Sequence, residues 1–304
     1  MDVCRQSPLF SHLLRLAAPV LTIGVALVVS TSGGSGAVWG KLSEQSAKQK
    51  SLEASIALPA DLDREEPQKQ AEVLLERAVV HSEGATGQIE TRMDAWRGKL
   101  QWDSQLGQLT TAALNSKDRA VQDCAMEVQL TAYGLSKSDS TVDALIQQAN
   151  SRNHAKKIWA LWGLALLGNR GIGTDRIVQT LSAHLKDGDH FKDSFSEDTR
   201  RWAVDGLALV GTNSTITPLL EAMHNDPSPA IRQRAAVSVA ESNMLTHEQR
   251  LIAVPRLIDY SADPELDAQT HTLAFQALSD ITGQRLPNDS TAWRDWYHTF
   301  GSNN

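Results

Sequence analysis

The sequence predicts an all-α fold in which pairs of helices stack into a right-handed α-α superhelix. The strongest observation is an internal repeat, because residues 157–168 and 200–211 are identical at seven of twelve positions. Weaker copies are centred on Ala125, Ala235 and Ala274, and together with the two strong copies at Ala160 and Ala203 they recur at intervals of 32 to 43 residues. A shorter apolar helix is expected in each interval, over residues 141–149, 175–185, 215–223 and 248–260. One helix pair cannot bury its apolar face alone, so stacking on the next pair is predicted.

Residues 1–40 differ in composition from the rest of the chain. Arg5 and Arg15 precede an apolar run over residues 16–29, and small residues follow as far as Ala37. This order is typical of an export signal. An uncleaved membrane anchor over residues 13–29 fits equally well, since its 17 residues approach the length of a membrane span. Both alternatives predict a periplasmic location or the extracytoplasmic face of the inner membrane.

The charge and the cysteine content exclude several classes of protein. The net charge is −7, and the first 50 residues hold five basic and two acidic residues, so the remainder carries −10. Such an acidic chain does not suit nucleic acid, and none is expected as a partner. Two cysteines, Cys4 and Cys124, are too few for a disulfide scaffold or a four-cysteine zinc site.

The segment between the export signal and the repeats divides into a linker and a helical part. Residues 41–65 are polar and end in an acidic stretch bracketed by prolines, which predicts a solvated linker with at most a helical turn. Residues 66–115 follow a helical spacing, and we expect them to pack on the repeats. The helices expected there cover residues 68–80, 87–102 and 104–114.

The copy at residues 225–236 carries the most specific motif in the chain. Asp226 and Pro227 form a turn, Arg232 follows, and paired alanines begin at Ala235. We expect Asp226 to cap the helix, Arg232 to pair with an aspartate of the turn or the adjoining repeat, and the alanines to admit a neighbouring helix. This pattern closely resembles the HEAT-like repeats of bacterial proteins, of the phycobilin-lyase type. The resemblance covers residues 116–283 and implies a HEAT- or armadillo-like solenoid that binds proteins.

The C-terminal segment, residues 284–304, is similar to the end segment of many bacterial HEAT-like proteins. Asp289 or Ser290 is expected to start a last helix. Trp293 and Trp296 lie three residues apart, so they share one face and can cover the last repeat. A capping helix is therefore predicted.

The chain shows no motif for catalysis, for a cofactor or for a metal ion. Gly168, Gly171 and Gly173 lack the lysine of a phosphate loop, and His247 with Glu248 is a single pair rather than a metal motif. Cys124 has no evident base nearby and is expected to be a buried small side chain. The longest interval between copies contains an inserted polar loop, which we interpret as a partner-contact loop rather than a cation site. Its contact residues are expected to be Asp187, Asp189, His190, Phe191, Asp193 and Phe195.

The eight tryptophans could indicate a ligand groove. Trp159 and Trp202 occupy equivalent positions of two copies, which favours a role in packing. The first hypothesis is therefore a non-enzymatic interaction scaffold that binds a protein partner. One alternative is a periplasmic binder of a small ligand or carbohydrate, and another is an enzyme similar to the phycobilin lyases.

Overall fold

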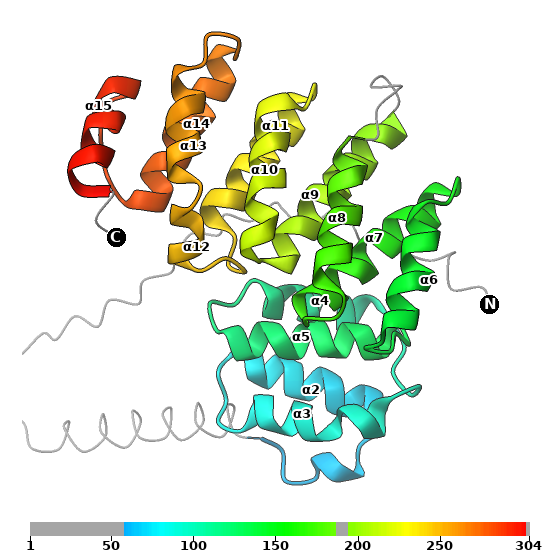
Figure 1. The fold of residues 1–304 in the computed structure, drawn as a ribbon. Coiled ribbons are helices and arrows are strands. Elements are labelled where there is room, and N and C mark those ends of the chain that lie inside the picture. The colour runs from blue at the N-terminus through cyan, green and yellow to red at the C-terminus, as the bar shows by residue number, and fades with distance from the viewer. Residues whose placement is uncertain (1–57, 187–193, 302–304) are drawn as a thin grey trace, which may run out of the picture. The chain divides into compact units, whose positions relative to one another are not determined.

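The computed structural model describes residues 58–186 and 194–301 of the chain. The predicted export signal or anchor and most of the predicted contact loop lie outside the described residues. The chain divides into two compact units, Met1–Gly134 and Leu135–Asn304. Both are helical, and the described ranges contain no strand (Figure 1). The prediction of an all-α chain is confirmed over these ranges.

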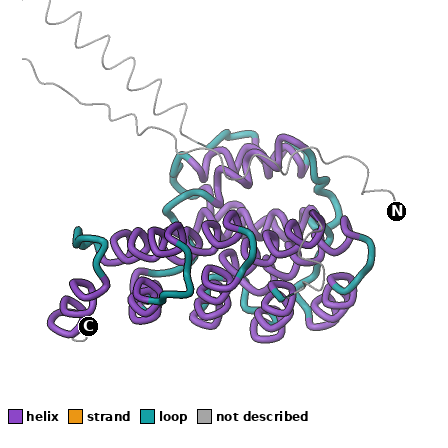
Figure 2. Tube along the Cα trace, turned by 90° about the horizontal axis from the view of Figure 1, so that it is seen from above, coloured by secondary structure: helices purple, strands orange, loops and turns teal. Residues whose placement is uncertain are grey.

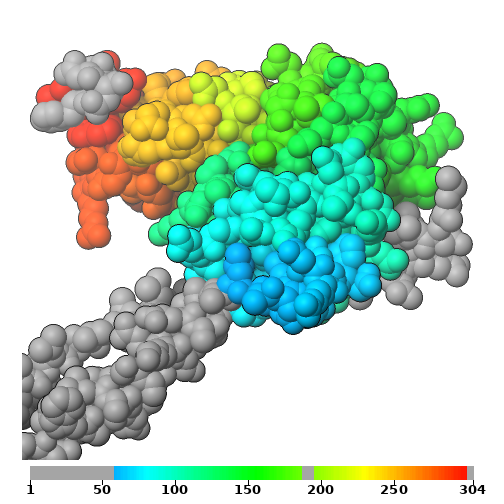
Figure 3. Space-filling model, turned by 90° about the horizontal axis from the view of Figure 1, so that it is seen from below, coloured from blue at the N-terminus to red at the C-terminus, as the bar shows by residue number. Residues whose placement is uncertain are grey.

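The first unit is a small bundle with its own core. Trp96 is completely buried, and its indole Nε1 donates to Oε1 of Gln70 at 3.0 Å. Figure 3 shows one face of this unit, coloured blue to cyan, as a close-packed surface. Its helices are α2 (Pro67–Val79), α3 (Ala85–Trp96), α4 (Ser104–Leu114) and α5 (Arg119–Ala132), after the single turn η2 (Leu62–Arg64).

Two features of the first unit differ from the sequence analysis. The second helix ends at Trp96 rather than at residue 102, because Gly98 has a left-handed backbone with φ of 75° that stops the helix. The end of the predicted linker is part of the fold, since Leu62 is buried in the core and Asp63 pairs with Arg92. Leu58 also packs against this core, so two leucines attach the mainly polar residues 58–65 to the fold.

The second unit consists of helices in two layers. The longer helices α7, α9, α11 and α14 contact one another in succession, and each also packs on the helix that precedes it. Figure 2 shows the two rows of helices from above. The helices are α6 (Asp139–Ala149), α7 (His154–Asn169), α8 (Thr174–Leu185), α9 (Ser194–Val210), α10 (Asn213–Asn225), α11 (Pro229–Glu241), α12 (His247–Leu251), α13 (Val254–Ala262), α14 (Ala268–Thr282) and α15 (Ser290–Trp296), followed by the turn η3 (Tyr297–Gly301).

The repeat pattern accounts for these layers. Ala160, Ala203, Ala235 and Ala274 lie in α7, α9, α11 and α14, and each is completely buried. Small side chains at these positions let neighbouring helices approach closely. The fifth copy, at Ala125, is also buried, but its helix α5 belongs to the first unit.

The last helix closes one end of the second unit. Asp289 is its N-cap and accepts a hydrogen bond from the amide of Thr291 at 2.8 Å. Trp293 is completely buried, and its indole Nε1 donates to the carbonyl of Pro287 at 3.1 Å. The ring of Trp296 stands edge-on to Trp293 at 5.9 Å, and α15 contacts α13.

Among residues 58–186 and 194–301, no helix combines the length and the apolar character that a membrane span requires.

Candidate interaction surface

Two arginine–aspartate pairs join successive repeats, and the first of them is buried. Arg200 on α9 is 1% exposed and binds Asp226 through two hydrogen bonds, Nε–Oδ2 at 2.7 Å and Nη2–Oδ1 at 3.2 Å. Such a two-point contact fixes both side chains in one geometry. The pair therefore links α9 to the turn that precedes α11.

Arg232 makes the equivalent link from α11 to α14. Its Nη2 donates to Oδ2 of Asp267 at 2.6 Å, and its Nε donates to the hydroxyl of Thr270 at 2.9 Å. Its Nη1 donates to the main-chain carbonyl of Asp226 at 2.8 Å. Arg232 thus contacts both the turn and the adjoining repeat, which the sequence analysis gave as alternatives.

Asp226 differs from its expected role as a helix cap. The N-cap of α11 is Ser228, with Pro229 at the first helical position, and Pro227 lies in the turn before it. Asp226 instead accepts a hydrogen bond from the Ser228 amide at 2.8 Å while its carboxylate faces Arg200. The carboxylate thus binds the amide of the N-cap residue and the arginine of the preceding repeat, and it caps no amide inside α11.

The repeat tryptophans pack against neighbouring side chains. Trp202 is 4% exposed, and its ring meets that of Trp162 edge-on at 5.9 Å. The guanidinium of Arg201 lies over Trp202 at 5.1 Å from the ring centre. Trp159 is half-buried. These contacts agree with a packing role for the tryptophans.

Phe195 is the one member of the predicted contact loop that the structure describes. Its side chain is 59% exposed at the start of α9. Its ring lies 4.8 Å from that of His154, whose Nε2 is 2.8 Å from Oδ2 of Asp198. Asp187, Asp189, His190, Phe191 and Asp193 lie outside the described residues.

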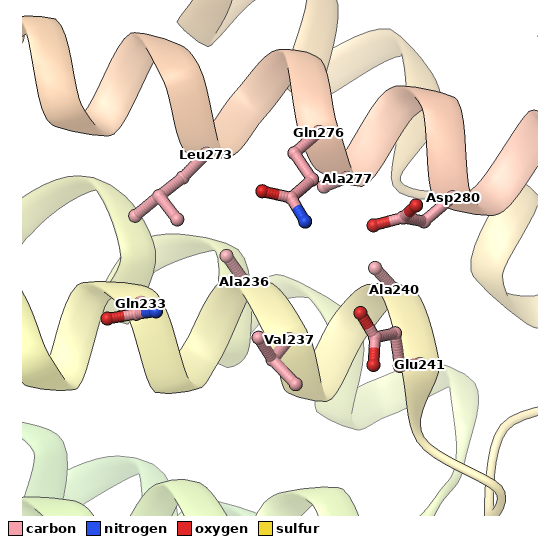
Figure 4. Close-up of a pocket in the computed structure, with 9 residues that line it drawn as sticks. All are labelled: Gln233, Ala236, Val237, Ala240, Glu241, Leu273, Gln276, Ala277 and Asp280. Carbon is pink, nitrogen blue, oxygen red and sulfur yellow. The ribbon is translucent and has the colours of Figure 1, made fainter. Parts of the chain in front are cut away.

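A shallow groove lies between α11 and α14, on the exposed side of the long helices. Small apolar residues form its floor, and Val237 at 38% exposure and the half-buried Leu273 lie beside them. Figure 4 shows the nine lining residues, Gln233, Ala236, Val237, Ala240, Glu241, Leu273, Gln276, Ala277 and Asp280. None of these nine residues was expected from the sequence to form a site. Val237 is the feature of the sequence that could have indicated this groove. It is an apolar residue on a helix face that otherwise carries polar side chains, with Gln233 one turn before it and Glu241 one turn after it.

Polar side chains on the same face of the neighbouring helices are paired. Nη2 of Arg234 on α11 donates to Oδ2 of Asp205 on α9 at 2.8 Å. Burial raises the pKa of the Asp205 carboxyl, and the Arg234 guanidinium opposes that rise. An ion pair therefore bridges α9 and α11. The residues that line the groove between α11 and α14 include no cation that could form such a pair.

Two further candidates from the sequence are placed by the structure. Cys124 is 2% exposed, and its Sγ lies 3.7 Å from the carbonyl of Thr86, which suits a buried structural thiol. Within the part of the chain that the structure describes, His, Cys, Asp and Glu form no group of three that could hold a metal ion.

Comparison with known families identifies the repeats. Residues 142–240 match the family model described as HEAT repeats, which covers α7 to α11 and most of α6. No curated protein matches the chain at a significant level. The match supports HEAT-like repeats in the second unit, and α14 continues the same packing beyond the matched residues.

Proposed function

We propose that the chain is an exported or membrane-tethered scaffold that binds a protein partner and catalyses no reaction. The observation that carries this proposal is the exposed groove between α11 and α14, beside Val237 and Leu273. HEAT repeats generally mediate protein–protein interaction, and solenoids of this kind use extended surfaces rather than closed pockets.

The dimensions of the groove favour a protein over a small ligand. Its cavity volume is about 50 Å³. Pockets that bury a small molecule enclose roughly 300–1,000 Å³. A surface this shallow can hold one or two side chains of a partner, which is how a protein interface places its anchors.

The proposed location depends on residues 1–40, with their basic start, apolar middle and small-residue end. A periplasmic or membrane-tethered scaffold keeps its acidic repeats outside the cytoplasm. This proposal has two forms: the chain is cleaved near Ala37, or it keeps residues 13–29 as an anchor.

Chemical crosslinking and pull-down from membranes, with the intact mass of the exported protein, test the proposal. We expect a stable protein partner crosslinked to the second unit and an extracytoplasmic chain. Recovery of a small molecule without a protein partner would contradict the scaffold. A mature chain that begins near Val38 would contradict the anchor, and a full-length cytoplasmic chain would contradict export.

A further inference from the structure

We propose that the groove between α11 and α14 binds a short amphipathic helix of the partner, with a lysine or arginine at the end formed by Glu241 and Asp280. This inference rests on the proposed scaffold function and specifies the chemistry of its partner. The apolar face of the helix covers Val237 and Leu273, and its basic end pairs with the two carboxylates.

The groove has an amide end and an acidic end. Figure 4 shows α11 and α14 running in the same direction, with Gln233 and Leu273 at one end and Glu241 and Asp280 at the other. The alanines Ala236, Ala240 and Ala277 lie between these ends and leave room for larger side chains of a partner. An occupant therefore meets apolar surface along the groove and negative charge at one end.

The polar side chains of the groove are unpaired. Gln233, Glu241, Gln276 and Asp280 are all exposed, and none forms a hydrogen bond or ion pair with the described residues. The nine lining residues include two carboxylates and no cation. Between α9 and α11, by contrast, Arg234 pairs with Asp205.

The position of these carboxylates on their helices strengthens the negative charge. Glu241 is the last residue of α11, Asp280 is in the last turn of α14, and neither last turn contains a basic residue. A helix C-terminus carries a partial negative charge, so an acidic side chain there is unfavourable for the helix itself. Arg250 donates to the carbonyl of Ala240 at 3.0 Å but forms no ion pair with Glu241. Arg250 thus compensates the carbonyl end of α11, while the carboxylates of Glu241 and Asp280 remain open to a cation on the partner.

The length of the groove limits the occupant. The eight-residue separation of Gln233 and Glu241 corresponds to about 12 Å along a helix. This length accommodates about two turns of a bound helix, with apolar side chains on successive turns.

Peptide binding to the full chain tests the inference. The probe is a synthetic helical peptide of about 15 residues with leucine and alanine on one face and lysine on the other. Its counterpart has glutamate in place of lysine. We expect fluorescence anisotropy to detect binding of the lysine peptide, weakened by salt, and much weaker binding of the glutamate peptide.

Two matched double variants distinguish binding in the groove from nonspecific attraction between the acidic chain and the basic peptide. Glu241→Gln with Asp280→Asn is expected to weaken binding of the lysine peptide about tenfold, since both ion pairs with the peptide are lost. Asp175→Asn with Asp259→Asn removes the same charge from other exposed positions of the second unit and should change the affinity less than about twofold. Thermal melts check that both double variants fold.

Three results would overturn the inference: no binding of the lysine peptide, equal binding of both peptides, or equal loss in both double variants. A photoreactive residue at position 237 tests the basic partner helix separately from the scaffold function. Capture of an acidic or uncharged partner segment there would contradict the basic helix and leave the scaffold intact. Absence of any partner along α9, α11 and α14 would contradict both.

Discussion

Arg200 is almost completely buried, and a buried guanidinium is tolerated only when its charge is compensated. Asp226 supplies that compensation from the next repeat through two hydrogen bonds. Removal of one partner leaves the other charge desolvated, whereas replacement of both by apolar residues does not. The two kinds of variant should therefore differ sharply in stability.

Asp226→Ala is expected to lower the free energy of unfolding by about 3–5 kcal/mol, because Arg200 then lacks its partner. The double variant Arg200→Met with Asp226→Leu should be more stable than Asp226→Ala alone. Urea unfolding followed by circular dichroism measures both. Equal losses in the single and double variants would mean that the pair matters through packing rather than charge.

Asp263 is one of the carboxyls that link the stability of the protein to acid pH. Oδ2 of Asp263 lies 2.8 Å from Nε2 of His224, and this hydrogen bond, with a second from the amide of Glu265, lowers the pKa of the carboxyl. A lowered folded-state pKa gives stability that is present above the unfolded pKa and lost as the pH falls through the folded pKa.

The melting temperature of the protein should therefore fall as the pH drops below the usual range of an aspartate. Asp263→Asn, which cannot titrate, should lose less stability over that interval than the unaltered chain. Thermal melts across the acid range provide the measurement. Parallel curves for the two proteins would contradict a contribution from Asp263.

At the scale of the element, Gly211 ends α9 where the chain approaches another segment closely. Its φ is 63°, and an added Cβ would lie 2.6 Å from Cβ of Met244. Gly171 has φ of 79°, but an added Cβ would meet no atom within 4 Å. The two glycines thus share backbone strain and differ in steric contact.

Gly211→Ala is expected to destabilise the protein by about 2–4 kcal/mol, from backbone strain together with the clash. Gly171→Ala should cost about 1 kcal/mol, from the backbone alone. Denaturant unfolding of both variants compares them directly. Equal costs would show that Met244 moves aside freely.

The helices were predictable where a periodic apolar pattern and a cap coincide. Residues 104–114 were placed at their observed bounds, because Asp103 caps the helix and its apolar spacing is regular. The helix that starts at Ala85 was extended too far, since Leu100 continues the apolar spacing beyond the left-handed Gly98. Local pattern alone does not report that backbone conformation.

The candidate surface was less predictable than the helices. Arg232 was identified from its motif, but the choice between the turn and the adjoining repeat depends on the distance between helices. The groove beside Val237 depends on which side of α11 faces α14, and it brings together residues about 40 positions apart. A single sequence does not provide that pairing.

At the scale of the whole molecule, the surface proposed to bind a partner is distinguished by the pairing of its charged side chains. In the second unit Arg234 pairs with Asp205 between α9 and α11, whereas Glu241 and Asp280 form no ion pair with the described residues at the groove between α11 and α14. Binding should therefore be localised on this face rather than spread over both layers.

The most direct test places a photoreactive residue either at Gln276, in the groove, or at Asp259, on the exposed side of α13. Crosslinking in intact cells, followed by mass spectrometry, should yield a protein partner from position 276 and little or none from position 259. Equal capture from both positions, or capture from position 259 alone, would contradict an interaction surface on the long helices.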